Sequence, residues 1–203
     1  MNIFVKNIGK EMEIDEGDNL FKILHLLPED NYVGAIVNDT VVDFYYQPEE
    51  GDKIEFITHD SEKALDILNH STSHILAWAV KSLFKGAKLG IGPSIKNGFY
   101  YDFLVEKPFT PEDIEKIENK MRELLTREYK FEKEEISKER AKELFKDEKF
   151  KLELIDELEE ETISIYKVGE FVDLCRGPHL PSTKYICLLY TSDAADEGLG
   201  VDL

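Results

Sequence analysis

His70 and His74 are the residues whose type and spacing most directly suggest chemistry. They lie four positions apart in the segment HSTSH, so on a helix they project from one face with their Cβ atoms about 5–6 Å apart. A helical wheel places this face opposite an apolar side that carries Leu68, Ile75, Ala79 and Leu83. The same spacing is typical of two exposed surface histidines, so it does not by itself decide for a site.

A second short segment, DLCRGPH, carries Asp173, Cys175 and His179. Gly177-Pro178 forces a turn, so Cys175 and His179 can converge without a helix. With the two earlier histidines they offer four nitrogen and sulfur groups, which suit a zinc site or a polar cleft that positions a hydrolytic water. The alternative is a buried structural cysteine beside a capping aspartate and an unrelated histidine. The pairing of both segments favours a site.

These groups must be positioned by residues 61–186, which the pattern predicts to form an α+β unit. Ser61 opens a helix that runs to about Phe84 and carries both histidines. Thr110, followed by proline, and Ser137 are predicted to cap two further helices. Strand-like segments are expected at 88–91, 99–103, 131–136 and 163–168. The charged residues of 106–161 are interpreted mostly as solvated helix faces.

Residues 1–60 are predicted to form a separate unit with the β-β-α-β-β order of a ubiquitin-like β-grasp. The expected strands lie near 3–5, 12–14, 33–37, 41–42 and 54–56. The expected helix is capped by Asp18 and has its apolar positions between Leu20 and Leu27. Asp18 and Asp52 are interpreted as turn residues, and nothing in this unit looks catalytic.

Composition excludes several classes of protein. The chain has 203 residues, of which 42% are hydrophobic, so wholesale disorder is excluded. No apolar run approaches the roughly 20 residues of a membrane span, and no signal peptide is evident, so we expect a cytoplasmic protein without a membrane partner. Two cysteines provide neither a disulfide framework nor a four-cysteine zinc site. The net charge of −18 argues against a dedicated duplex-DNA binder, though not against an RNA-processing module.

The last segment, CLLYTSDAADEGLGVDL, does not continue the preceding pattern. It begins at Cys187 and has neither lysine nor arginine. Its first part is similar to the in-frame translation of a transposon-type sequencing adapter, and a flexible acidic tail is the alternative. We expect 187–203 to be foreign and the natural sequence to break near Ile186, which makes the chain an N-terminal fragment of a longer protein.

Three segments resemble the N-terminal region of bacterial threonyl-tRNA synthetases: HSTSH, GIGPSIKNGFYYDF at 90–103 and VDLCRGPHLPST at 172–183. The resemblance implies a TGS domain at 1–60 and, at 61–186, an editing domain of the type shared with alanyl-tRNA synthetases. It implies a catalytic set of His70, His74, Lys151, Asp173, Cys175 and His179, with Tyr101 as a pocket wall. Lys151 comes from the match of the segment FKLELI; spacing alone would not single it out.

The implied activity is hydrolysis of seryl-tRNA(Thr), with the acceptor end of tRNA(Thr) as partner. Serine and threonine differ by one methyl, and a missing methylene contributes only about 1–3 kcal/mol of discrimination, so a second sieve is needed. We assign His70 and His179 to positioning water and the terminal ribose, and Lys151 to the developing oxyanion or the nucleic-acid end. Asp173 would orient a cation or the serine amine, and Cys175 would shape the pocket.

Metal use stays open from the sequence. We favour metal-free, water-mediated hydrolysis and no cofactor in this segment, but His70, His74, Cys175 and His179 would equally suit tetrahedral zinc. The family's ATP, Mg²⁺ and Zn²⁺ sites, and its homodimer interface, would belong to a catalytic core beyond Ile186. Alternatives are a freestanding trans-editing deacylase, a non-catalytic TGS-containing RNA-binding module, or a TGS-containing kinase, for which the P-loop motif GxxxxGK[ST] is missing from the sequence.

Overall fold

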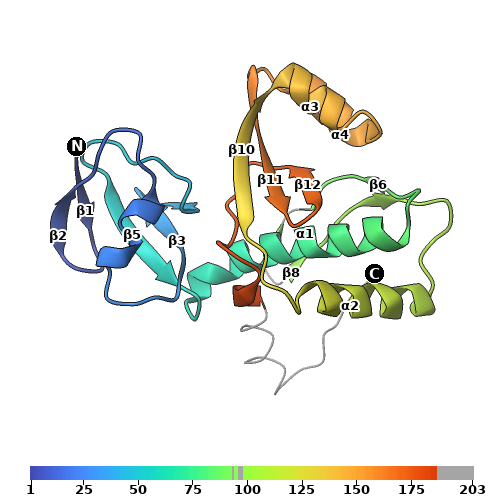
Figure 1. Ribbon diagram of the computed structural model, residues 1–203, viewed down its shortest axis with the longest axis horizontal. Coiled ribbons are helices and arrows are strands. Elements are labelled where there is room, and N and C mark those ends of the chain that lie inside the picture. Colours follow the sequence, from blue (N-terminus) through green and yellow to red (C-terminus); the bar gives the residue numbers. More distant parts are fainter. Residues whose placement is uncertain (93, 96–97, 187–203) are drawn as a thin grey trace.

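The computed structural model describes residues 1–92, 94–95 and 98–186, and it is an α+β protein as expected. An N-terminal unit built on one five-stranded sheet lies beside a second unit, in which the long helix α1 (Leu65–Leu83) runs beneath a three-stranded sheet (Figure 1). The predicted foreign tail at 187–203 lies outside the described residues. No helix within these described residues is long and apolar enough to cross a membrane.

The sheet of the N-terminal unit has the order β2-β1-β5-β3-β4, with β1 and β5 parallel and the other neighbours antiparallel. Its strands are β1 (Asn2–Val5), β2 (Lys10–Glu13), β3 (Tyr32–Val37), β4 (Thr40–Val42) and β5 (Lys53–Thr58). Asn38 and Asp39 both have positive φ in the two-residue turn between β3 and β4, a conformation that asparagine and aspartate tolerate in tight hairpins. The five predicted strands are therefore present, with shifted ends.

The predicted helix after Asp18 is wrong. The structure has two 3-10 turns, Leu20–Lys22 and Leu24–Leu26, and Asp18 only pairs with Lys22, 3.8 Å away, without capping a helix. The segment between Asp18 and Pro28 is shorter than the roughly 12 residues that an isolated helix needs. Burial of its apolar residues against the sheet therefore decides its conformation.

Asp52 is more than the turn residue that we expected. Its side chain is buried, and its carboxylate accepts hydrogen bonds from Asn38 Nδ2 (2.6 Å), Tyr46 Oη (3.0 Å) and the Glu49 amide (2.9 Å). It therefore joins three segments of the N-terminal unit. None of these partners lies in the second unit.

In the second unit, Ser61 caps a 3-10 turn, Glu62–Ala64, that leads directly into α1, so the predicted helix is confirmed. The predicted division of α1 into an apolar and an opposite face is only partly right. Ile75 and Ala79 are fully buried, but His74 is also 98% buried (2% exposed) and Leu83 is 40% exposed. The reason is that α1 contacts helix α2 (Pro111–Leu124) and, elsewhere, strands β7 (Ser94–Ile95) and β8 (Gly98–Phe99), so both sides of its middle are covered.

The two capped helices are confirmed and a third was missed. Helix α2 (Pro111–Leu124) has a complete capping box between Thr110 and Asp113, and Ser137 caps α3 (Lys138–Leu144). Helix α4 (Lys149–Glu157) follows Glu148, whose side chain makes no cap hydrogen bond. Because a cap signal is missing, no local pattern indicates where α4 begins.

The strands of the second unit form one sheet and two small hairpin ladders. The sheet is antiparallel, in the order β10-β11-β12, with β10 (Phe131–Ser137), β11 (Thr162–Val168) and β12 (Phe171–Leu174). Strand β6 (Lys88–Leu89) pairs with β9 (Phe103–Leu104), and β7 (Ser94–Ile95) pairs with β8 (Gly98–Phe99). The predicted strand at 99–103 is therefore two strands, and β12 was not predicted. Helix α1, the hairpin of β6 and β9, and the segment after β12 together enclose the candidate site.

Candidate functional site

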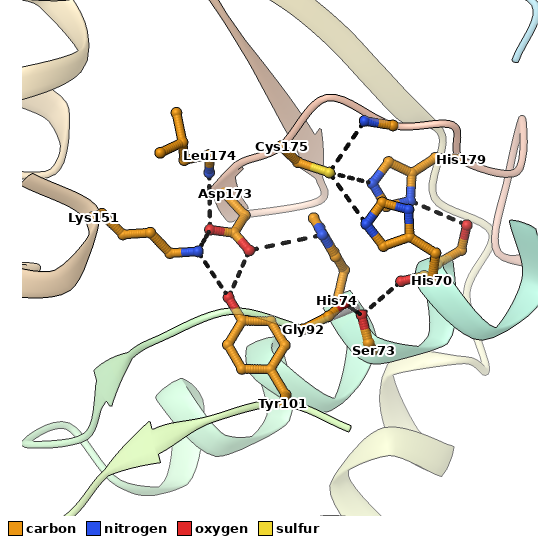
Figure 2. A network of polar contacts seen from close by, with 12 residues as sticks. His70, Ser73, His74, Gly92, Tyr101, Lys151, Asp173, Leu174, Cys175 and His179 are labelled. Atoms are coloured by element: carbon orange, nitrogen blue, oxygen red, sulfur yellow. Dashed lines mark hydrogen bonds and ion pairs between the residues drawn. The ribbon is translucent and has the colours of Figure 1, made fainter. Parts of the chain in front are cut away.

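The side chains of His70, Cys175 and His179 meet where α1 faces the loop after β12 (Figure 2). Cys175 Sγ lies 3.2 Å from Nε2 of His70 and 3.2 Å from Nε2 of His179. The two imidazole rings are stacked, with centroids 4.2 Å apart. Gly177, with φ of +79°, turns the chain between the cysteine and His179, and its amide donates to Cys175 Sγ over 3.3 Å. The expected convergence of the two sequence segments is present.

The hydrogen-bond partners fix where the protons lie. His70 Nδ1 is 3.1 Å from the Pro178 carbonyl, which can only accept, so Nδ1 carries the proton and Nε2 faces the thiol as an acceptor. Ser71 Oγ accepts from the Leu180 amide (2.9 Å) and lies 3.1 Å from His179 Nδ1. If Ser71 donates to that nitrogen, His179 Nε2–H donates to sulfur and the thiol donates to His70. This is the arrangement in which every contact has one donor and one acceptor.

Burial keeps these groups uncharged. Loss of hydration lowers the pKa of His70, lowers that of His74 to about 3 and lowers that of His179 well below its usual value. The same cause raises the pKa of Cys175 to about 12. At neutral pH the cluster therefore holds three neutral imidazoles and a thiol, and the thiolate that a nucleophilic cysteine needs is disfavoured.

A buried ion pair lies on the other side of His74 (Figure 2). Lys151 Nζ is 2.7 Å from Asp173 Oδ1, and each side chain is only 2% exposed. Tyr101 Oη donates to Asp173 Oδ2 over 2.6 Å and accepts from Lys151 Nζ over 3.2 Å. The Leu174 amide donates to Asp173 Oδ1 over 2.8 Å. Lysine, tyrosine and backbone thus satisfy the carboxylate, which a buried charge requires.

His74 lies between the two groups of contacts. Its Nε2 is 3.7 Å from Asp173 Oδ2, but burial keeps the imidazole neutral, so this contact is not an ion pair. Its Nδ1 is buried without a hydrogen-bond partner among the described residues. Unpartnered buried nitrogen is costly, so this atom is available to a water, a substrate group or a metal ion.

The four predicted zinc ligands fit a metal ion by composition. The donor atoms of His70, His74, Cys175 and His179 all lie within 4.8 Å of one another, three nitrogens and one sulfur are a tetrahedral zinc set, and His74 Nδ1 has no competing partner. With all four as ligands, however, a tetrahedral ion would keep no open position for a reacting water. Such a set is suited to a structural ion more than to a catalytic one.

All seven residues predicted for the site lie in this one connected cluster, and sequence reasoning missed two more. Ser71 stands within HSTSH, but the pattern gave it no role. Asp43 belongs to the N-terminal unit, where no catalytic feature was expected, yet its carboxylate accepts from Tyr166 Oη and from the His179 amide. Asp43 and His179 are 136 positions apart, and no local sequence pattern predicts a contact between residues so far apart.

Comparisons with known proteins agree with this picture. Residues 163–188 match the family model described as the threonyl and alanyl tRNA synthetase second additional domain, and this match contains the loop from Cys175 to His179. The threonine--tRNA ligase of Geobacter sp. (strain M21) is 51% identical over 183 residues, which are 88% of this chain and 29% of that protein. That alignment is longer than either unit alone, so both units share in the similarity.

This chain is a homologue of the threonine--tRNA ligases. The ligase of Thermotoga neapolitana is 44% identical over 192 residues, covering 92% of this chain and 30% of that protein. The ligase of Aquifex aeolicus is 43% identical over 187 residues, covering 89% and 29%. The chain thus spans less than a third of the length of these threonine--tRNA ligases. The resemblance noted from HSTSH and DLCRGPH is confirmed.

Proposed function

We propose that this chain is the N-terminal part of a threonine--tRNA ligase and that its residues 61–186 hydrolyse seryl-tRNA(Thr). The observation that carries the proposal is the neutral His70–Cys175–His179 cluster beside the buried Lys151–Asp173 pair. The cluster offers proton acceptors and donors for water, and the ion pair offers groups for an amino acid and a developing oxyanion. The family match over 163–188 supports an editing role for this unit.

The reaction is ester hydrolysis. The oxygen of water bonds to the seryl carbonyl carbon, the ester bond to the ribose breaks, and the water's proton passes to the ribose oxygen, which leaves serine and tRNA(Thr). We assign His70 and His179 to positioning the water and the terminal ribose. His70 is only partly buried, so solvent reaches this histidine more readily than it reaches His74 or His179. Lys151 would stabilise the oxyanion, Asp173 would orient the serine amine, and Tyr101 would wall the pocket.

Cys175 is assigned to shaping the pocket and holding the two histidines. As a thiol it accepts from His179 and Gly177 and donates to His70, and burial opposes its ionisation. A water nucleophile is therefore favoured over covalent catalysis. We propose hydrolysis without a metal. If zinc is bound by the four donors, it would supply a fixed charge that holds them together.

The N-terminal unit, residues 1–60, is proposed to be a TGS domain of the β-grasp type. Its support is the sheet order β2-β1-β5-β3-β4 with a parallel central pair, which is typical of ubiquitin-like folds. We also propose that ATP, Mg²⁺, Zn²⁺ and a homodimer interface belong to the remaining length of the parent ligase. The acceptor end of tRNA(Thr) is the proposed partner.

The test is deacylation of tRNA(Thr) charged with serine or with threonine. The chain should release serine faster than threonine, and the double variant His70→Ala/His74→Ala should release neither while it still unfolds cooperatively. His25→Ala, an exposed histidine of the N-terminal unit, is the control and should match the parent chain. Treatment with a chelator should leave the rate unchanged. A chain that binds tRNA(Thr) but never releases serine would instead be a non-catalytic RNA-binding module.

A further inference from the structure

Asp43 belongs to the N-terminal unit but its carboxylate is bonded to the second unit. It follows β4 and is buried, with 7% of its surface exposed. Oδ2 accepts from the hydroxyl of Tyr166 on β11 (2.5 Å) and from the backbone amide of His179 (3.3 Å). Oδ1 accepts from the Tyr45 amide (3.0 Å). Hydrogen bonds to a carboxylate are stronger than neutral ones, so this residue ties the two units together at the site.

The loop from Cys175 to His179 packs directly against Asp43 and Tyr166. Gly177 lies so close that a Cβ atom there would be 2.4 Å from Tyr166 Oη and 2.9 Å from Asp43 Oδ2. The ring of Tyr166 packs against the imidazole of His179, with centroids 4.5 Å apart. Phe131 stacks on that imidazole nearly parallel, at 5.1 Å and 5°. Asp43 and Tyr166 therefore contact the backbone of the loop, and Tyr166 and Phe131 contact the ring of His179.

A second residue of the N-terminal unit supports the same pocket. Tyr45 Oη donates to the carbonyl of Phe131 over 3.1 Å, and its ring meets that of Tyr166 edge-on at 6.5 Å. Asp43 and Tyr45 thus contact Tyr166, Phe131 and the His179 backbone from outside the second unit. The hydrogen-bond partners of the Cys175 sulfur are instead His70, His179 and Gly177 of the second unit.

We infer that Asp43 is a positioning residue for the hydrolytic site, so that full activity requires the N-terminal unit to be docked. This inference rests on the proposed function. By fixing the amide of His179, Asp43 sets where the imidazole meets Cys175 and Ser71. Displacement of a catalytic group by about 1 Å can lower a rate about 100-fold, so this remote carboxylate influences turnover without touching substrate.

Asp43→Asn is the most specific substitution, because it keeps the size and shape of the side chain and changes only its hydrogen-bonding groups. Both carboxylate oxygens only accept hydrogen bonds, from Tyr45 on one side and from Tyr166 and His179 on the other. An amide must place its NH₂ against one of these donors, so one side is lost. We expect kcat for seryl-tRNA(Thr) to fall about 10- to 100-fold. KM should change less than about twofold, since the hydrogen bonds of the Asp43 carboxylate go to Tyr45, Tyr166 and the His179 backbone and to none of the residues assigned to the seryl group.

Asp52→Asn is the matched control. Asp52 is a second buried aspartate of the same unit, and its partners Asn38, Tyr46 and Glu49 all lie within that unit. This variant should lower the thermal midpoint but keep kcat. Tyr166→Phe retains the ring on His179 and removes only the hydroxyl, so kcat should fall here too. The double variant Asp43→Asn/Tyr166→Phe should lose less than the product of the two single effects on kcat, because both changes act on the hydrogen bond from Tyr166 to Asp43.

The outcomes separate the inference from the proposed function. If the parent chain hydrolyses seryl-tRNA(Thr) and both Asp43→Asn and Tyr166→Phe keep its kcat, the inference is overturned. If Asp43→Asn does not fold, Tyr166→Phe alone decides in the same way. If the parent chain does not hydrolyse seryl-tRNA(Thr), the proposed function fails. The ¹⁵N chemical shifts of the His179 imidazole then test whether Asp43 positions this ring. Relative to the parent chain, these chemical shifts should change in Asp43→Asn and remain the same in Asp52→Asn. Unchanged shifts in both variants would overturn the inference.

Discussion

Ser71 controls the protonation pattern of the cluster at the scale of a single hydroxyl. Its oxygen accepts from the Leu180 amide and lies 3.1 Å from His179 Nδ1, to which it donates in the arrangement that gives every contact one donor and one acceptor. Ser71→Ala leaves both partners unpaired in a buried site, which should cost about 1–3 kcal/mol of stability. It also releases His179 to carry its proton on Nδ1, so the rate of serine release should fall at least about tenfold. Urea unfolding and the deacylation assay measure the two effects.

Ser82→Ala is the control for this prediction. Ser82 lies near the end of the same helix, and its hydroxyl donates to the Trp78 carbonyl one turn earlier. Because it is exposed, its loss should change stability by less than about 0.5 kcal/mol. The rate should not change. Equal rates for Ser71→Ala and the parent chain would show that the tautomer of His179 is set by other groups.

Lys151 should be needed for stability as well as for activity. Replacing it by methionine leaves the Asp173 carboxylate, 2% exposed, without its partner at 2.7 Å. Removal of one member of a buried ion pair costs about 3–5 kcal/mol. Adding Asp173→Asn to Lys151→Met should restore part of this loss, since no unpaired charge then remains. Urea unfolding of both variants tests this, and a double variant less stable than Lys151→Met alone would contradict it.

How much of the site could be predicted differs from residue to residue. His70, His74, Cys175 and His179 stand in two short segments with recognisable spacing, so the sequence points to them directly. Lys151 was found only through resemblance, because nothing local separates it from other lysines. Its burial depends on Asp173 and Tyr101 arriving from distant strands and loops.

At the scale of elements, the hairpin of β6 and β9 holds Tyr101 through a close glycine contact. A Cβ atom on Gly92 would lie 2.1 Å from the ring of Tyr101, so Gly92→Ala must displace that ring or the hairpin. Tyr101 would then lose its bonds to Asp173 and Lys151. We expect slower serine release, by roughly tenfold or more if the shift approaches 1 Å.

Gly86→Ala is the matched control for the hairpin. A Cβ atom at Gly86 has nothing within 4 Å, so the added methyl should be tolerated. Its release rate should equal that of the parent chain. If Gly92→Ala is equally active, the ring of Tyr101 has room to move and its position is not important for hydrolysis.

Helices α2 and α3, which have a cap signal, were predicted well, and helix α4 and strand β12, which show no clear local signal, were not. Thr110 and Ser137 mark their helices because their hydroxyls accept from the first turn. Helix α4 lacks such a residue, and β12 is too short to show a clear alternation. The segment after Asp18 shows the opposite error, because a helix was predicted there and two 3-10 turns are present. These turns bury the apolar residues Leu20, Ile23 and Leu27 without a helix.

For the whole molecule, the buried histidines predict acid sensitivity. Folding lowers the pKa of His74 to about 3 and that of His179 well below 6.5. Above pH 6.5 both states hold neutral rings, so these groups give no pH dependence. Below it only the unfolded chain gains protons, and stability falls by about 1.4 kcal/mol per pH unit for each histidine until the folded pKa is reached.

The measurement is urea unfolding at pH 7 and pH 5. His74→Gln should lose less stability between these two pH values than the parent chain, by about 2 kcal/mol. His25→Ala, which changes an exposed ring, should keep the parent's slope. A His74→Gln variant with the parent's slope would show that His74 is protonated in the folded protein.

The distance along the chain between Ser71 and His179 has a consequence for biosynthesis. These contacting residues are 108 positions apart, and ribosomes add about 5–20 residues per second. Helix α1 therefore leaves the ribosome roughly 5 to 20 seconds before the loop that covers its polar face. During that interval its histidines and serines are bonded to water, and Asp43 has no His179 amide to accept from. The two units can only be joined at the site after the last of its residues has been made.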